Sequence, residues 1–276
     1  MNFLKKIIFI AFSSIILSLI LSFGVSAERY SVGGYEIPVD VVVNGHILRT
    51  PEKAFLEHDT VFVPLRAVAE ATGATVNWNG ETDIATVELG DDMVEFSENT
   101  SEDAAVMHEE TMFVPVRDLA ESLGYTVTWD DYYFQVWISA PDVFIEEEHR
   151  NHVYTNNDIL LLAKVLQSEC GSSPFEAKIA VANVVCNRVE SDLFPDSVSE
   201  VIYDRRGGSI QFSIAYNGVL EKTEPSDECI LAAKCALNGV VVAKDCLFFQ
   251  ADYVENSWMN NNREYAMSLG GNAFFY

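Results

Sequence analysis

Basic residues are scarce in this chain of 276 residues. Only 17 lysines and arginines stand against 42 aspartates and glutamates, which gives a formal net charge of -25. Most of the excess lies in residues 28–150, which hold 26 acids and six bases. A protein that binds nucleic acid neutralises phosphates with a basic face. The composition therefore excludes nucleic acid as a partner, leaves an uncharged glycan open, and is for the most part typical of a solubilising surface.

The sequence also lacks the spacings that bind metals. It has no CxxC pair, and His46, His58 and His108 show no ligand spacing with one another or with cysteine. No histidine follows His152, which argues against a cysteine protease centred on Cys170. We expect neither a metal nor a cofactor.

Cysteines are few, and all five lie in the second half of the chain. Five is an odd number, so at least one has no partner within the chain. Cys186 and Cys235 fall in apolar helical patterns, and we predict that both are small core residues. Disulfides are compatible with an exported protein, but the sequence assigns none.

Long apolar runs are missing everywhere except at the start. MNFLKK supplies a basic segment, IIFIAFSSIILSLILSFG an apolar run, and VSA, Val25 to Ala27, a small-residue cleavage pattern. This order predicts a signal peptide over residues 1–27. An uncleaved membrane anchor is the alternative, because the run is long enough to span a bilayer. Both interpretations predict a secreted or cell-wall-associated protein.

An internal repeat fills the first half. TVFVPLRAVAEATGATVNW, Thr60 to Trp78, matches TMFVPVRDLAESLGYTVTW, Thr111 to Trp129, without a gap. Each copy predicts a strand, a helix and a second strand. The helix carries an apolar stripe at spacings of three and four, follows a proline suited to its first turn, and ends at a glycine suited to a left-handed conformation. The paired positions are Pro64 and Pro115, Arg66 and Arg117, and Gly73 and Gly124.

Upstream, VDVVVNGHIL places Asn44-Gly45 between two apolar runs, which is a strong hairpin signal. Together with the repeat, residues 35–139 resemble the copper amine oxidase-like N-terminal domain of exported bacterial proteins. The resemblance implies an accessory or stalk module that is associated with the cell wall. We expect structural roles for Arg66 and Arg117, since both copies contain them.

The second half differs in kind. Residues 141–156 form a predicted linker, with a proline, an acidic run and little periodicity. A helix then begins at a cap supplied by Asn157 or Asp158. Ser173-Pro174-Phe175-Glu176 predicts the start of the next helix, with Ser173 and Glu176 as a capping box. A further helix is predicted over Asp227–Asn238, ended by Gly239.

One acid interrupts the first of these helices. Ile159, Leu162, Leu166 and Glu169 share a face, so Glu169 takes the next place in an apolar row. Apolar neighbours and the negative end of the helix would both raise its pKa. A carboxyl that stays protonated near neutral pH suits a general acid. The alternative is an exposed glutamate at a frayed helix end.

The second half also resembles a known enzyme family. ILLLAKVLQSECGSSPFEAKIAVANVVCNRV, followed by VIYDRRGG, SIQFS, ALNG, CLFF and GGNAFF, is similar to the SleB-type cell wall hydrolases over residues 157–276. The resemblance implies a mainly helical, lysozyme-like domain that cleaves peptidoglycan glycan strands as a lytic transglycosylase. It implies that Glu169, in the motif SECGSS, is the catalytic acid. The chain departs from the family at Gly171, Ser173 and Asn272.

The resemblance also implies weaker candidates for substrate binding. Gln211, Phe212 and Ser213 match a QFS segment, whose amide, ring and hydroxyl suit an acetamido sugar, although a cap or core role is an alternative. Tyr216, Phe249 and Trp258 could stack on sugars or pack in the core.

We therefore predict an α+β protein with four parts: a signal peptide (1–27), a small two-repeat α+β module (28–140), a linker (141–156) and a mainly helical lysozyme-like catalytic domain (157–276). The predicted activity is cleavage of the MurNAc-GlcNAc β-1,4 bond by a lytic transglycosylase with one glutamate. A hydrolytic muramidase and a wall-binding protein with an inactive catalytic domain are the alternatives. The predicted partner is the peptidoglycan glycan strand.

Overall fold

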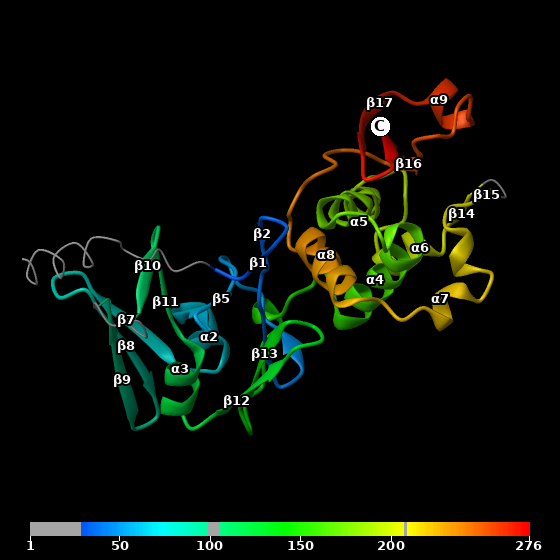
Figure 1. The fold of residues 1–276 in the computed structure, drawn as a ribbon. Coiled ribbons are helices and arrows are strands. Elements are labelled where there is room, and N and C mark those ends of the chain that lie inside the picture. The colour runs from blue at the N-terminus through cyan, green and yellow to red at the C-terminus, as the bar shows by residue number, and fades with distance from the viewer. Residues whose placement is uncertain (1–28, 99–104, 207–208) are drawn as a thin grey trace, which may run out of the picture.

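The structure is a computed structural model that describes residues 29–98, 105–206 and 209–276. The predicted signal peptide lies outside the described residues. A strand-rich region is followed by a helical one (Figure 1), which confirms the predicted α+β class. Within the described ranges, no helix combines the length and the apolar character needed to cross a membrane.

The two copies of the repeat fold alike, element for element. The first copy contains β5 (Phe55–Glu57), β6 (Thr60–Pro64), α2 (Leu65–Ala71), β7 (Thr75–Asn79) and β8 (Ile84–Leu89). The second contains β10 (Val106–His108), β11 (Thr111–Pro115), α3 (Val116–Ser122), β12 (Thr126–Asp130) and β13 (Gln135–Ser139). Every element of the second copy begins 51 residues after its counterpart, as Thr111 follows Thr60.

The boundaries within each copy follow the predicted local chemistry, with one shift. Each proline is the last residue of a strand and the N-cap of the helix that follows. It therefore lies just before the helix and not, as the sequence predicts, in its first turn. Gly73 and Gly124 have φ of 86° and 79°, the left-handed conformation that their positions predict. Arg66 and Arg117 form matching ion pairs with Glu70 and Glu121 on their own helices.

The copies meet across a local two-fold axis. β6 and β11 are antiparallel neighbours at the centre of the sheet β10-β11-β6-β5, and Val63 faces its own equivalent, Val114. A second sheet has the order β12-β13-β3-β4. There β3 (Asp40–Val43) and β4 (His46–Ile47) form the predicted hairpin, with Asn44 at φ 49° and Gly45 at φ 85°.

Smaller sheets complete the strand-rich region. β9 (Asp92–Ser97) extends the sheet β7-β8-β9, and β1 (Ser31–Val32) pairs with β2 (Tyr35–Glu36). β13 differs from its counterpart β8 because it pairs in parallel with β3, whereas β8 pairs antiparallel with β9. The second copy is thereby joined to the chain segment that precedes both repeats.

The helical region is organised around α5 (Phe175–Val189), which is largely buried and packs against its neighbours α4 and α8. Its helices are α4 (Asn156–Cys170), α5, α6 (Val198–Ile202), α7 (Val219–Lys222), α8 (Asp227–Leu237) and α9 (Trp258–Asn262). Two 3-10 turns, η1 (Glu147–His149) and η2 (Ser213–Ala215), and the strands β14 (Arg205–Arg206), β15 (Ser209–Ile210), β16 (Phe248–Ala251), β17 (Tyr265–Leu269) and β18 (Asn272–Phe275) complete it. α8 and its C-terminal glycine, Gly239 at φ 90°, agree with the prediction.

The predicted helix caps are wrong at two places. Thr155 caps α4 in a capping box with Asp158, so the cap lies two residues before Asn157. α5 has no side-chain cap, because Ser173 Oγ donates instead to the carbonyl oxygen of Gly270 at 3.1 Å. Glu176 accepts a hydrogen bond from the Tyr35 hydroxyl at 2.9 Å. At α5, partners from distant parts of the chain replace the predicted local cap.

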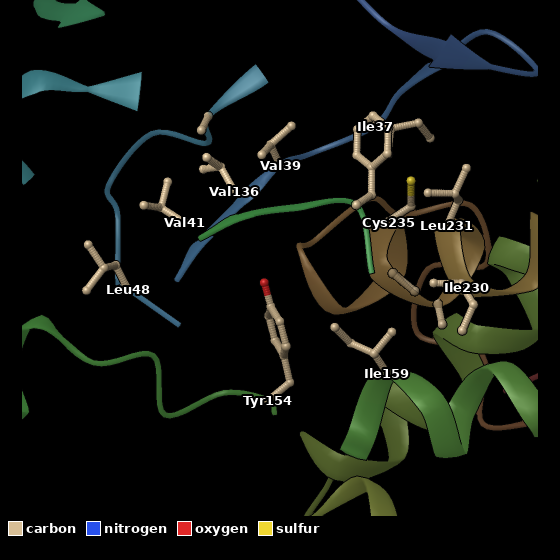
Figure 2. Packing of buried hydrophobic residues seen from close by; sticks show 14 of the residues in the cluster. Ile37, Val39, Val41, Leu48, Val136, Tyr154, Ile159, Ile230, Leu231 and Cys235 are labelled. Carbon is tan, nitrogen blue, oxygen red and sulfur yellow. The ribbon is translucent and has the colours of Figure 1, made fainter. Parts of the chain in front are cut away.

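One hydrophobic core runs through both regions. Figure 2 shows Tyr154 between the strand that carries Val39 and Val41 and the helices that carry Ile159 and Ile230. The predicted linker takes part in this core, since Ile145 and Tyr154 are 1% and 4% exposed.

An ion pair lies at the centre of this junction. Lys234 on α8 is 0% exposed, and its Nζ is 2.9 Å from Oδ2 of Asp40 on β3. Nζ also donates to the carbonyl oxygens of Tyr133 and Phe134, both at 2.7 Å. An ammonium group has three N–H donors, so all are satisfied. Burial lowers the pKa of Lys234, and Asp40 opposes that shift.

We predict that Lys234→Met lowers the free energy of unfolding by about 3–5 kcal/mol, because it leaves the Asp40 carboxylate buried without its cation. Equilibrium denaturation in urea measures this change. The double variant Asp40→Leu/Lys234→Met should lose less stability than the sum of the two single variants. Strictly additive losses would show that the two side chains are not coupled.

Candidate active site

Glu169 lies on the last turn of α4. The three apolar positions that precede it on its face, Ile159, Leu162 and Leu166, are each 0% exposed, as the pattern predicts. Glu169 itself is exposed. Among the described residues, none forms a hydrogen bond or an ion pair with its carboxylate. The row of core side chains therefore ends at a carboxyl that faces outward.

The residues around Glu169 are held in place by contacts with later parts of the chain. Oε1 of Gln167 accepts from the backbone N–H of Ser226 at 2.9 Å and from the thiol of Cys229 at 3.4 Å. Ser168 Oγ donates to the carbonyl oxygen of Lys164 and lies 3.2 Å from Thr223 Oγ1. These contacts fix the end of α4 against α7 and the start of α8, which does not support a frayed helix end.

Gly171 is the C-cap of α4 and lies very close to Gln167. It has φ -55°, so it needs no left-handed conformation. A Cβ at this position would lie 2.6 Å from the carbonyl oxygen of Gln167 and 2.5 Å from its Nε2. A larger residue could enter only if the Gln167 side chain and backbone moved. Glycine here therefore permits the tight turn directly after Glu169.

The electrostatic surroundings of Glu169 suit a proton donor. Desolvation by the surrounding protein raises the pKa of Glu169. The carboxyl is accessible to solvent and is also close to protein. Both conditions can hold because the helix end that carries it packs against other segments. Such a group can be reached by a ligand and still favours its protonated form.

Cys170, the next residue, is not a nucleophile. It is 5% exposed, and burial raises the pKa of its thiol to about 12. A thiol needs to ionise near neutral pH to attack a substrate. All five cysteines are described, and all are free thiols. Cys235 is buried as predicted, whereas Cys186 is only partly so.

The structure separates the three predicted substrate-binding residues. Phe212 is 2% exposed and packs in the core, with its ring 6.4 Å from that of Phe249 and 5.5 Å from the Arg188 guanidinium. Gln211 is partly exposed, and Ser213 is exposed at the start of η2. η2 packs against α7, and α7 packs against α4. Gln211 and Ser213 therefore belong to a segment that packs, through α7, against the helix that carries Glu169. Among the described residues, neither forms a hydrogen bond with Glu169.

The other aromatic candidates also differ in their surroundings. Tyr216 and Phe249 are partly buried, and Arg205 covers the Tyr216 ring at 3.6 Å. Trp258 is 59% exposed on α9, with the Arg263 guanidinium 5.2 Å from its ring. Sequence reasoning missed Gln167, Ser168 and Thr223, the residues that hold the end of α4. Their partners lie about 55 to 60 positions further along the chain, so no local signal could have found them.

Comparison with known families assigns the two regions. Residues 172–276 match the Cell Wall Hydrolase family model. Glu169 lies three positions before the matched segment of this cell wall hydrolase region. Residues 42–102 and 97–165 match the copper amine oxidase N-terminal domain model. Both resemblances expected from the sequence are confirmed.

The cell wall hydrolase region is similar to curated proteins called spore cortex-lytic enzyme. That of Oceanobacillus iheyensis is 36% identical over 107 residues, which cover 38% of this chain and 37% of that protein. That of Bacillus subtilis is 32% identical over 107 residues, 38% of this chain and 33% of that protein. The chain thus spans about a third of the length of these relatives.

A solved structure is also similar to this region. It is the catalytic domain of the germination-specific lytic transglycosylase SleB from Bacillus anthracis, 28% identical, with a TM-score of 0.41. The similarity covers 46% of this chain and 99% of that one.

We predict that the Glu169 carboxyl titrates above its ordinary pKa of 4.5 in the folded protein and returns to it in urea. Carboxyl 13C NMR with Glu169→Gln for assignment measures both states. Because the folded pKa is the higher one, the stability that this proton contributes is present at low pH and is lost as the pH rises through the folded pKa. An identical midpoint in both states would contradict the desolvation described above.

Proposed function

We propose that this protein cleaves peptidoglycan glycan strands, with Glu169 as its single acid and base. The observation that carries the proposal is the accessible Glu169 carboxyl, without a described partner and with a raised pKa, at a helix end fixed by Gln167 and Ser168. It directly precedes a region that matches the Cell Wall Hydrolase family. Relatives of that region are named spore cortex-lytic enzymes.

In the proposed reaction, the protonated Glu169 donates to the glycosidic oxygen between N-acetylmuramic acid and N-acetylglucosamine. The bond from the muramyl C1 to that oxygen breaks, and an oxocarbenium-like state forms. The Glu169 carboxylate then accepts the proton of the muramyl 6-hydroxyl as its oxygen attacks C1. The product is a 1,6-anhydro sugar, Glu169 is protonated again, and no water is consumed.

Glycosidases that use water need two carboxyl groups about 5–9.5 Å apart. The resemblance to the SleB-type cell wall hydrolases assigns no second catalytic acid in residues 157–276, which favours the route with one carboxyl group over hydrolysis. A hydrolytic muramidase is therefore the second candidate. A wall-binding protein with an inactive catalytic domain is the third, suggested by Gly171 and Ser173 in the altered motif.

The remaining assignments follow from this function. Gln211 and Ser213 supply an amide and a hydroxyl for the acetamido sugar, and Phe212 positions their segment from within the core. The enzyme acts outside the cytoplasm, either secreted or held at the cell wall, where its substrate lies. The strand-rich module contributes to wall association.

We expect Glu169→Gln to lower the rate of peptidoglycan digestion by about 10²–10⁴-fold, because general acid and base catalysis is removed. Glu176→Gln is the matched control: it makes the same change at an exposed glutamate on the next helix and should keep near-normal activity. Mass spectrometry of the wild-type digest should show anhydromuramyl ends. Reducing muramyl ends would instead support the muramidase, and equal digestion by both Glu169 forms would refute the catalytic role.

Gln211→Ala and Ser213→Ala should raise KM about tenfold with less effect on kcat, since each removes a hydrogen bond to bound substrate rather than the proton donor. Phe212→Leu should lower the thermal midpoint instead, because the ring packs in the core. Steady-state kinetics on solubilised peptidoglycan and thermal denaturation distinguish the two effects. An unchanged KM in both surface variants would remove this segment from the substrate site.

A further inference from the structure

The strand-rich module carries two hollows, of about 980 Å³ and about 810 Å³. The first is lined by Arg117, Trp129 and Asp59, among others, and the second by Arg66, Trp78 and Glu110. Both volumes lie in the range of small-molecule binding sites. Glu169 is not among the residues that line either hollow.

The two hollows are built from equivalent residues. Pro64, Leu65, Arg66, Val76 and Trp78 of the second correspond, 51 positions on, to Pro115, Val116, Arg117, Val127 and Trp129 of the first. The opposite wall shows the same relation with the copies exchanged. Asp59 and Thr60 of the first hollow correspond to Glu110 and Thr111 of the second.

This exchange follows from the pairing of β6 with β11. Because Val63 faces its own equivalent Val114, the hairpin of each copy lies beside the helix and strand of the other. Each hollow therefore takes the shared arginine and tryptophan from one copy and the shared acid and threonine from the other. These central walls are duplicated, which favours a binding site over an incidental gap between elements.

The groups that both hollows share define a chemistry. Both have an indole ring, a guanidinium, an acid from the opposite hairpin and a threonine hydroxyl. Each is also lined by three further acids, which are Asp118, Asp131 and Asp227 in the first hollow and Glu70, Glu109 and Glu148 in the second, and the second hollow also contains Arg49. Trp78 is 45% exposed, and the Arg66 and Arg117 side chains are 57% and 61% exposed. Their ion pairs leave other guanidinium N–H groups available. An apolar face, donors and acceptors are thus offered together.

We infer that these hollows are twin non-catalytic binding sites for a neutral glycan. An anion would be repelled by the four acids that line each hollow. A sugar ring uses the carboxylates and the guanidinium for its hydroxyls and stacks its C–H face on the indole. The inference deepens the proposed function by naming what the module binds. It rests on that function for the source of the glycan, the cell wall, but not on catalysis by Glu169.

The first hollow has additional walls. Tyr30, Tyr132 and Phe134 add rings, and Asp227 and Leu231 come from α8 of the helical region. A glycan held there touches both regions of the protein. We expect it to bind more tightly than one in the second hollow, because the extra rings bury more of the sugar.

The test uses the full chain with Glu169→Gln, so that no sugar is cleaved, and the β-1,4 tetramer of N-acetylglucosamine as the probe. The indole N–H signals of Trp78 and Trp129 in 15N NMR report on the two hollows separately. Both signals should shift and saturate on titration. Assignment comes from Trp78→Phe and Trp129→Phe.

Because each hollow takes its shared acid from the opposite copy, a change of that acid should affect binding at the tryptophan of the other copy. Asp59→Asn should weaken binding at Trp129 about tenfold and leave Trp78 unchanged, and Glu110→Gln should do the reverse. Asp91→Asn, an exposed acid of the same module outside both hollows, is the matched control and should change neither. Indole signals that do not respond to the tetramer would overturn the inference, as would a response to hexalysine alone, which would identify a cationic occupant. These titrations do not depend on catalysis, so their result stands even if Glu169 proves not to be catalytic.

Discussion

The buried ion pair between Lys234 and Asp40 is the constraint on which the arrangement of this protein depends. It joins a helix of the helical region to a strand that precedes both repeats, and three acceptors satisfy the ammonium group. Neither charge is stable there without the other. Apolar side chains on both sides complete a common core (Figure 2). The repeat module therefore shares its core with the helical region, unlike a stalk on a flexible tether.

In the role proposed for it, Glu169 is a proton donor that has no hydrogen-bond or ion-pair partner among the described residues. The neighbours of the carboxyl are fixed by Gln167 and Ser168, and Gly171 turns the chain away at once. The protein desolvates the Glu169 carboxyl, but no described residue pairs with it. In the functions proposed above, cleavage of the polymer falls to Glu169 and its retention to the two hollows of the acidic module.

Much of the fold could be predicted because its signals are local. The internal repeat predicted a strand, a helix and a second strand in each copy, and Asn44-Gly45 and Gly239 marked turns that only a few residue types tolerate. The apolar row leading to Glu169 was equally plain. Long-range partners were not predictable: Gly270 accepts from Ser173, and Tyr35 donates to Glu176, which removes the expected capping box. The burial of Phe212 and the equivalence of the two hollows likewise depend on packing that no single segment encodes.

The position of Asp40 has a consequence for biogenesis. The strand that carries it leaves the ribosome early, while its cation is synthesised only after the whole repeat module and most of the helical region. Domains made first generally begin to fold first. Here, however, the first-made part retains an unneutralised carboxylate and an uncovered apolar face until the last third of the chain arrives. If the chain crosses a membrane during its synthesis, binding by a chaperone would be most useful in that interval.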